Sequence, residues 1–318
     1  MKNTVSGKIL KGVGGLYTVK ITSQDSEFFG STLRCRARGS FRHNNMTPFP
    51  GDCVMLALDD SNTKKQKDES DFVIEEIVDR KNSLIRPPMA NLDLLFVTMA
   101  AAAPTPILST ADKLISIAEH NGIEPIVVVT KCELDEAEAT RIKDIYERCG
   151  ITCFCLSAKE NTGVCEIEQF IKKNMSGKTA AFAGASGIGK STLINRLFPE
   201  LDLSTAQISR KIERGRHTTR SVELFETSQS DDCGYIADTP GFSLLDFNRF
   251  DFFEKDDLVY TMREFEQYIG QCRYTKCSHT KEEGCAIVEA VKNGKIPKSR
   301  HESYVELYDI LKMRKKWD

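Results

Sequence analysis

The sequence has 318 residues, a hydrophobic fraction of 40% and a charged fraction of 28%, so it resembles an ordinary globular chain and not a disordered or fibrous one. At this length we expect two or three domains. The formal net charge of −2 means that any contact with nucleic acid has to use local basic patches. The 11 cysteines occur without an apolar leader, and the longest apolar stretch, residues 94–103, is too short to span a membrane. We therefore expect a cytoplasmic protein whose thiols lie in the core or bind metal.

The first 80 residues or so predict short β-strands separated by glycine-containing turns. Residues 16–21 alternate as a half-buried strand does, and residues 53–58 form a short apolar strand. Several short strands at this spacing favour a small β-barrel of the OB type. Arg34, Arg36 and Arg38 would share one face of a strand. A solvated face and a nucleic-acid contact both fit that pattern.

The middle of the chain alternates apolar strands with helices. This alternation indicates a parallel sheet covered by helices on both faces. Strands are predicted at residues 92–99, 125–129, 151–156, 179–183, 221–226 and 234–237, and helices at 110–120, 136–149 and 192–197.

A third part begins near residue 256. Apolar residues there recur at helical spacing and predict one continuous helix, with Leu258, Met262, Phe265 and Ile269 on its face. A Cys/His cluster and a lysine-rich helical tail follow.

Residues 184–191 match the phosphate-binding pattern G-x-x-x-x-G-K-[ST], between an apolar strand and a helix. The glycines let backbone N–H groups curl around phosphate oxygens, and the helix N-terminus favours negative charge. Lys190 is predicted to neutralise the β- and γ-phosphates, and Ser191 to bind Mg²⁺. The whole predicted loop consists of Gly184, Ala185, Ser186, Gly187, Ile188, Gly189, Lys190, Ser191 and Thr192.

Two downstream segments fit the magnesium and switch elements of a P-loop hydrolase. Asp238 ends an apolar strand and opens the sequence D-T-P-G, so we expect it to hold Mg²⁺, with the Gly241 N–H sensing the γ-phosphate. Residues 215–220 are polar and basic, and Thr219 in this stretch would close onto Mg²⁺ when the γ-phosphate is present.

Two loops predict which nucleotide base the site recognises. They follow consecutive strands, at the strand ends where ligands bind in such sheets. GTPases use a carboxylate in an N-K-x-D motif for guanine N1–H and NH₂, and a backbone N–H of an S-A-K loop for O6. The corresponding residues here are Thr130, Lys131, Cys132 and Glu133 in the first loop, and Ser157, Ala158 and Lys159 in the second. Both loops precede the phosphate loop, the reverse of the usual order, which indicates a circularly permuted GTPase domain.

The first loop departs from the usual motif. Thr130 replaces asparagine, and Glu133 replaces aspartate and is one methylene longer, so guanine discrimination is open. Cys132 is either an inert small residue or a modifiable thiol.

On these motifs, and on residues 34–39, 50–52 and 80–88, the chain resembles the ribosome small-subunit-dependent GTPase A family (RsgA, also YjeQ) over nearly its full length. The resemblance implies an OB-fold RNA-binding domain at 1–82, a permuted GTPase domain at 83–247 and a mainly helical zinc-binding domain at 248–318. It also implies a monomer that binds the small (30S) ribosomal subunit and its 16S rRNA and acts in late maturation of the subunit. Hydrolysis of GTP to GDP and phosphate would be stimulated by the subunit.

The catalytic residue is predicted from the same resemblance. Phe242 stands where Ras-like proteins carry a water-orienting glutamine, and an apolar ring cannot orient water. The resemblance makes His217 the candidate, with a surface histidine as the alternative. Gly187 replaces the asparagine common in potassium-dependent GTPases, so no dedicated potassium site is expected.

The Cys/His cluster has a spacing of C-x₄-C-x-H-x₅-C. Three thiolates and an imidazole suit one tetrahedral zinc ion with a structural role, and the family's zinc motif strengthens this interpretation. The predicted ligands are Cys272, Cys277, His279 and Cys285. The alternative is a set of core cysteines with an unrelated histidine.

Two other functional classes stay open. One is a P-loop ATPase or kinase acting on a small molecule, which competition between GDP and ADP would separate from a GTPase. The other is an RNA-binding module that does not depend on nucleotide, which subunit-stimulated GTP turnover would exclude.

Overall fold

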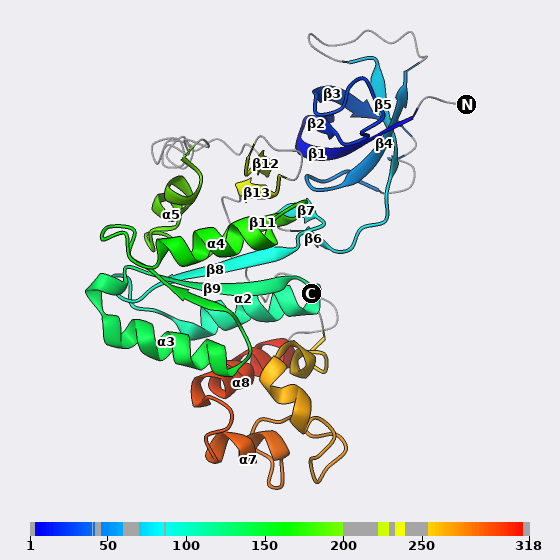
Figure 1. Ribbon diagram of the computed structural model, residues 1–318. Coiled ribbons are helices and arrows are strands. Elements are labelled where there is room, and N and C mark those ends of the chain that lie inside the picture. The colour runs from blue at the N-terminus through cyan, green and yellow to red at the C-terminus, as the bar shows by residue number, and fades with distance from the viewer. Residues whose placement is uncertain are drawn as a thin grey trace. The chain divides into compact units, whose positions relative to one another are not determined.

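The computed structural model describes residues 4–39, 41, 46–59, 70–85, 87–199, 222–228, 233–238 and 254–313. The chain divides into two compact units, whose helices and strands are labelled in Figure 1. The first comprises Met1–Asp93, Asn174–Ala181 and Ala206–Pro240, and the second comprises Leu94–Lys173, Phe182–Thr205 and Gly241–Asp318. The domain boundaries expected from the sequence, after residues 82 and 247, stay a prediction.

A closed barrel forms the N-terminal part of the first unit. Its strands are β1 (Val5–Val13), β2 (Leu16–Ile21), β3 (Thr32–Ala37), β4 (Cys53–Leu58) and β5 (Phe72–Ile77). Neighbours pair in the order β1-β2-β3-β5-β4, and β4 returns to pair with β1, which closes the barrel. The β3–β5 pair is parallel and the other pairs are antiparallel. This confirms the predicted OB-like barrel and its strands at 16–21 and 53–58.

The side chains on one face of each strand pack into the core of the barrel. Ile9, Val19, Leu56 and Ile74 are fully buried inside it. On β3, Cys35 points into this core, while Arg34 on the alternate face is exposed. Arg36 shares that face but is half-buried, and Arg38 lies just past the end of β3, where it pairs with Glu75 at 3.2 Å.

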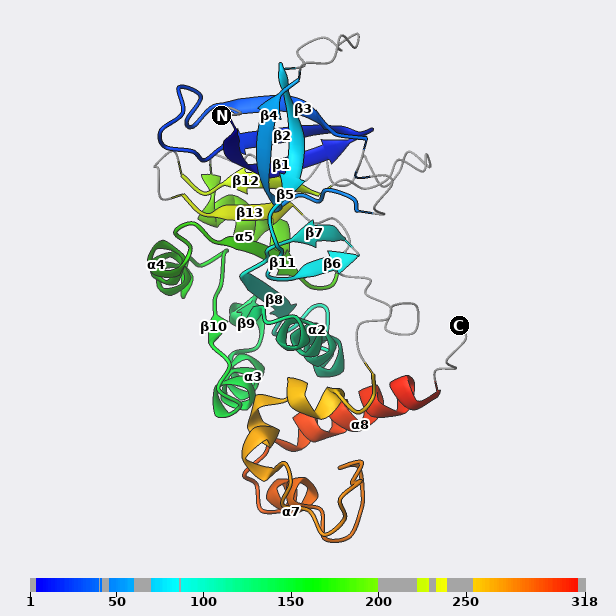
Figure 2. The same ribbon diagram turned by 90° about the vertical axis from the view of Figure 1, so that its right-hand side faces the viewer.

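The barrel strand β1 also pairs with a second set of strands in the first unit. These are β12 (Glu223–Glu226), β13 (Tyr235–Asp238) and the first three residues of β11 (Thr179–Ala183), whose last two residues belong to the second unit. β1 pairs antiparallel with β12, β12 antiparallel with β13, and β13 parallel with β11 (Figure 2). A short hairpin of β6 (Ser83–Ile85) and β7 (Pro88–Ala90) belongs to the same unit.

Lysines of the barrel reinforce this pairing. Lys8 is buried, and its Nζ donates to Thr179 Oγ1 at 2.7 Å and lies 4.5 Å from the ring centroid of Tyr235. Burial lowers the pKa of Lys8. Two ion pairs link the barrel to β12, Lys11 of β1 to Glu223 and Lys20 of β2 to Glu226.

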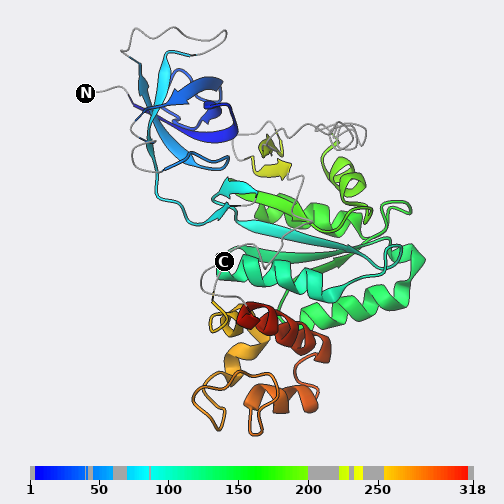
Figure 3. The ribbon, with the colours of Figure 1, turned by 180° about the vertical axis from the view of Figure 1, so that it is seen from behind.

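The second unit contains a parallel sheet with helices on both faces. Its strands are β8 (Leu94–Ala100), β9 (Glu124–Thr130) and β10 (Cys153–Cys155), and every residue of β8 is buried. α2 (Leu108–His120) and α3 (Glu136–Arg148) cover one face, and α4 (Val164–Asn174) covers the other (Figure 3). α5 (Lys190–Leu197) follows β11. The predicted strands and helices are confirmed, with ends that differ by a few residues.

The C-terminal part differs from its prediction in one element. The single helix expected through Leu258, Met262 and Phe265 is wrong, because two 3₁₀ helices occur instead, η4 (Leu258–Thr261) and η5 (Arg263–Tyr268). Met262 between them has an extended backbone, with φ −111° and ψ 96°. Three of the four predicted side chains are buried and Ile269 is half-buried, so the spacing indicated burial and not helix type. α7 (Ala286–Lys292) and α8 (Lys298–Met313) complete this part.

A buried charge cluster holds α8 against the sheet's helices. The Arg300 side chain is 1% exposed, and it donates to Asp112 of α2 at 2.5 Å and to Glu264 of η5 at 2.7 Å. The Tyr146 hydroxyl of α3 donates to the same Asp112 oxygen at 3.0 Å. Burial raises the pKa of Asp112, and the guanidinium opposes that shift. Arg300 therefore joins α8 to α2 and η5 directly, and Tyr146 adds α3 through Asp112.

None of the helices in the described ranges combines the length and the apolar character that crossing a membrane requires.

Replacing Arg300 with alanine is expected to lower the free energy of unfolding by about 3–5 kcal/mol, because two buried carboxylates lose their cation. Lys298→Ala on the same helix, where the side chain is 82% exposed, should change it by less than about 0.5 kcal/mol. Urea unfolding followed by circular dichroism measures both. Equal effects of the two substitutions would contradict a structural role for the cluster.

Candidate nucleotide-binding site and metal centre

The phosphate loop follows β11 and has a backbone that only glycine fits at two points. A Cβ on Gly184 would lie 2.2 Å from the carbonyl oxygen of Thr98, so the loop passes too close to β8 for any side chain. Gly189 has a φ of +90° where α5 begins. Lys190 folds back over the loop, with its Nζ donating to the Gly184 carbonyl at 3.1 Å. Residues 185–187 are exposed.

The loop after β9 is bound directly to the phosphate loop. The buried Thr130 hydroxyl lies within hydrogen-bonding distance of the Ile188 carbonyl and 3.1 Å from that of Met99. Lys131 has a left-handed backbone, with φ 56°, and its Nζ donates to the Gly187 carbonyl at 2.7 Å. The two predicted motifs therefore meet in space, although their order along the chain is reversed.

This contact also bears on the replacement of asparagine by threonine. A hydroxyl has one proton, so Thr130 donates to one of its two carbonyl neighbours at a time, whereas an asparagine amide has two N–H donors. Thr130 therefore still links this loop to the phosphate loop, but with one hydrogen-bond donor where asparagine would have two.

The second base loop packs against the first. The Cys132 N–H donates to the Leu156 carbonyl at 3.3 Å, and Ser157 just beyond is fully buried. A hydrogen bond from the Ser157 side chain lowers the pKa of Glu133, so this carboxyl is charged at neutral pH. The Glu133 Oε2 atom is shielded from solvent and has no hydrogen-bond partner among the described residues. An unpaired, charged acceptor therefore lies where the two loops meet.

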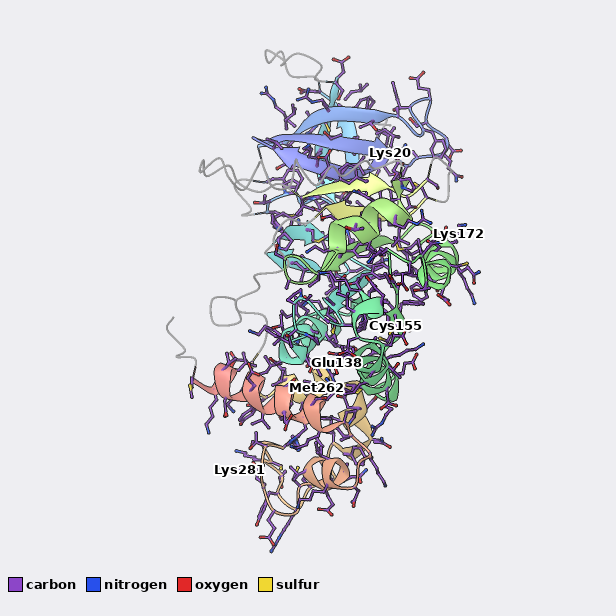
Figure 4. All side chains as sticks on the ribbon, turned by 90° about the vertical axis from the view of Figure 1, so that its left-hand side faces the viewer. Lys20, Glu138, Cys155, Lys172, Met262 and Lys281 are labelled. Carbon is purple, nitrogen blue, oxygen red and sulfur yellow. The ribbon has the colours of Figure 1, made fainter. Side chains whose placement is uncertain are left out.

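The thiol of Cys132 is held in its neutral form. Hydrogen bonding with Cys155, together with burial, raises the pKa of Cys132 far above its ordinary value. Cys155 itself lies at the end of β10 against α3, where its thiol donates to the Ala139 carbonyl at 3.5 Å (Figure 4). Neutral thiols are weak nucleophiles, which favours the inert interpretation of Cys132.

Other predicted nucleotide-site residues are placed in part. Ser191 and Thr192 lie in the first turn of α5, half-buried and exposed respectively. Ala158 is half-buried and Lys159 is exposed. Asp238 ends β13, but its side chain is not among those described. The predicted residues His217, Thr219 and Gly241 lie outside the described residues.

The four predicted metal ligands converge. One ligand atom from each of Cys272, Cys277, His279 and Cys285 lies within 4.8 Å of all the others. The Cys272 and Cys285 sulfurs are 3.8 Å apart, and the His279 Nδ1 is 3.4 Å from the first and 3.6 Å from the second. A tetrahedral ion about 2.3 Å from each thiolate sets sulfurs about 3.8 Å apart, so the cluster fits zinc. Burial lowers the pKa of His279, which favours the neutral imidazole that a metal requires.

Neighbouring groups fix the shape of the metal-binding loop. The Glu282 carboxylate accepts from the backbone N–H groups of Ser278 at 2.9 Å and of Thr280 and Lys281 at 3.1 Å. Burial opposes ionisation, but these bonds and one from the Ser278 hydroxyl lower the pKa of Glu282 to about 2. On the other side, the Tyr304 hydroxyl of α8 donates to the Ser278 carbonyl at 2.9 Å.

Comparison with known proteins agrees with this geometry. The family model described as the RsgA GTPase matches residues 77–248, and that of the RsgA N-terminal domain matches residues 6–64. The small ribosomal subunit biogenesis GTPase RsgA of Ruminiclostridium cellulolyticum is 37% identical over 311 residues, covering 96% of this chain and 93% of the relative. Its counterpart in Clostridium beijerinckii is 39% identical over 316 residues, covering 98% and 100%. The chain belongs to the RsgA GTPase family.

Solved structures of the same kind cover the whole fold. YjeQ from Thermotoga maritima matches with a TM-score of 0.76 and 29% identity, covering 98% of this chain and 100% of that one. YloQ, a circularly permuted GTPase, matches with a TM-score of 0.74 and 31% identity, covering 99% and 98%. The chain is therefore a permuted GTP hydrolase, as its motif order predicts, and P-loop hydrolases act on the Mg²⁺ complex of their nucleotide.

Sequence reasoning missed the charged residues that support these sites. Arg300 lies on the buried face of α8 with Ser303, Tyr304, Leu307 and Leu311. The i, i+3, i+4, i+7 spacing of that face was available in the sequence and would have placed a cation in the core. The role of Glu282 had no comparable signal, because its partners are backbone N–H groups.

Replacing Glu282 with glutamine is expected to weaken zinc binding about tenfold to hundredfold, because the loop loses a charged acceptor for its N–H groups. Glu283→Gln is the matched control, since Glu283 is the exposed neighbour. Competition with a chromophoric chelator measures both affinities. The contribution of the carboxylate is complete above its ordinary pKa of 4.5 and is lost as pH falls toward about 2. Identical affinities in the two variants would refute the role assigned to Glu282.

Proposed function

We propose that this chain binds the small ribosomal subunit and acts in its late maturation, as a GTPase whose turnover the subunit stimulates. The relatives from Ruminiclostridium cellulolyticum and Clostridium beijerinckii both carry the name small ribosomal subunit biogenesis GTPase RsgA. The observation that carries the proposal is that the first base loop contacts both the phosphate loop, through Thr130 and Lys131, and the second base loop, beside Ser157. It supports a guanine-nucleotide site inside a chain that matches these relatives over nearly their full length.

The proposed nucleotide contacts follow from chemistry. Residues 184–192 would surround the phosphates, with Lys190 releasing the Gly184 carbonyl to meet β- and γ-phosphate oxygens. Ser191, Asp238 and Thr219 would bind Mg²⁺. The unpaired Oε2 of Glu133 would accept from guanine N1–H and NH₂, and its solvent-shielded position supports this role. The backbone of residues 157–159 would donate to O6.

Hydrolysis requires an oriented water. His217 is our candidate, as a neutral imidazole that accepts a proton from the water attacking the γ-phosphorus, with GDP as the leaving group. We further propose one structural zinc ion at the Cys/His cluster, a monomer, a cytoplasmic location and 16S rRNA as the surface contacted on the subunit.

Replacing Glu133 with glutamine tests guanine recognition. We expect GDP affinity to fall about 10- to 150-fold, because a charged acceptor bonded to the base is lost, while weak ADP affinity stays unchanged. Fluorescence titration with labelled GDP and ADP competitors measures both. Parallel losses for GDP and ADP would place Glu133 outside the base site, and a wild-type preference for ADP would favour the ATPase alternative.

Comparing GTP hydrolysis with and without isolated small subunits tests the ribosomal role. We expect slow turnover alone and strong stimulation by the subunit. His217→Ala should abolish the stimulated rate and leave GDP affinity within about twofold, because the imidazole acts on water and not on the bound base. Absence of stimulation in the wild-type protein would overturn the ribosomal role, and full stimulation in the variant would overturn only the assignment of His217.

A further inference from the structure

A pocket of about 710 Å³ opens in the C-terminal part of the second unit, beside the metal cluster. Its size falls in the range of sites for small ligands, about 300–1,000 Å³. η4, the metal-binding loop and the buried side of α8 supply its walls. The residues that matter for its chemistry are Lys255, Tyr260, Tyr274, Lys276, Tyr304 and Tyr308.

The tyrosines of this pocket differ in how they are held. Tyr304 is buried and tied to the Ser278 carbonyl, and the Tyr308 ring lies 6.1 Å from it. Tyr260 and Tyr274 are 70% and 51% exposed, which is high for aromatic side chains. Two solvent-facing rings thus stand at a pocket whose inner wall is fixed by packing.

The charge of the pocket is basic. Lys276 is exposed, and Lys255 lies 5.8 Å from the ring centroid of Tyr308. Asp256 is the one carboxylate among the described lining residues, and it pairs with Lys255 at 2.7 Å. Because both members of this pair are solvent-exposed, the pair is weak, and Lys255 can exchange its partner for a phosphate.

Exposed aromatic rings beside lysines are the chemistry that recognises unpaired nucleotides, since a base stacks on the ring and the phosphate meets the cation. We propose that this pocket takes one unpaired nucleotide of RNA, with its base against Tyr260 and Tyr274 and its phosphate at Lys255 and Lys276. A double helix is too wide for such a pocket, and an apolar peptide would leave the lysines without partners. The proposal rests on the proposed function, and it identifies one contact by which the protein recognises the small subunit.

The metal-binding loop forms part of the same wall, through Cys272, Cys277 and His279. The position of Tyr274 and Lys276 therefore depends on the fold of that loop. Lys281 is in the same loop but is not among the residues that line the pocket, and Figure 4 shows it on the left-hand side of the C-terminal part. It provides a control with the same charge.

The test is chemical probing of the bases of 16S rRNA in small subunits, with the full-length, zinc-loaded protein at saturating concentration. The wild type is expected to protect one or a few unpaired nucleotides that the variant Tyr260→Ala/Tyr274→Ala leaves reactive, while the rest of the footprint stays. Affinity for the subunit should fall about tenfold to hundredfold in this variant. The variant Tyr260→Phe/Tyr274→Phe should restore both, because phenyl rings stack equally well. Lys276→Gln should weaken binding and flatten its salt dependence, and Lys281→Gln should do neither.

Three results have distinct meanings. A wild-type protein without any footprint would remove the proposed function itself. A complete footprint and full affinity in the alanine variant would overturn the nucleotide pocket and leave the proposed function standing. Weaker binding by that variant with every RNA protection kept at saturation would assign the pocket to a ribosomal protein, and this too would overturn the inference.

Discussion

The loop that follows β9 is held to the phosphate loop by side-chain donors, Thr130 to the Ile188 carbonyl and Lys131 to that of Gly187. In a permuted chain this contact matters more than usual, because α3, β10, α4 and β11 separate the two loops along the backbone. The geometry of the proposed guanine site relative to the phosphate loop is therefore set through space. Gly184 provides a second contact of this kind, because the absence of a Cβ lets the phosphate loop pack directly against β8. Strand packing and these few polar contacts together define one site from distant segments.

A few polar contacts also fix the C-terminal part of the second unit. Arg300 binds carboxylates of α2 and η5, and so the helix that carries Tyr304 is fixed to the nucleotide-binding half. Tyr304 in turn holds the metal-binding loop at Ser278. A buried ion cluster costs desolvation free energy, which is repaid only when each charge is paired. Here Arg300 bonds to a carboxylate oxygen of both Asp112 and Glu264, and the result is a continuous series of contacts from α2 to the loop that carries the Cys/His cluster.

Much of the fold and site was predictable because the relevant patterns are local. Strands 16–21, 53–58 and 179–183 match the structure residue for residue, since alternation or an apolar run bounded by turns marks each one. The phosphate loop and the two base loops were proposed from the sequence because their residue types follow directly from ligand chemistry, and the structure places the first base loop in contact with the phosphate loop. The failure at Leu258–Thr261 and Arg263–Tyr268 has a different cause, because burial at helical spacing does not separate an α-helix from two 3₁₀ helices. The unpaired oxygen of Glu133 was also out of reach, since it depends on packing between two loops.

The shared strand β1 has a consequence for how the chain can be divided. It closes the barrel by pairing with β2 and β4, and it also pairs with β12. β12 in turn pairs with β13, the strand that ends at Asp238. A fragment cut at the end of the barrel would leave β12 with unsatisfied backbone groups along an open sheet edge, which is a known route to aggregation. Lys11 and Lys20 would be lost with the cut, and Glu223 and Glu226 would stand without their counter-ions. The barrel is therefore a separate stretch of the sequence, but its strand β1 covers the edge of β12. The barrel and the strands β12 and β13 are best regarded as one folding unit.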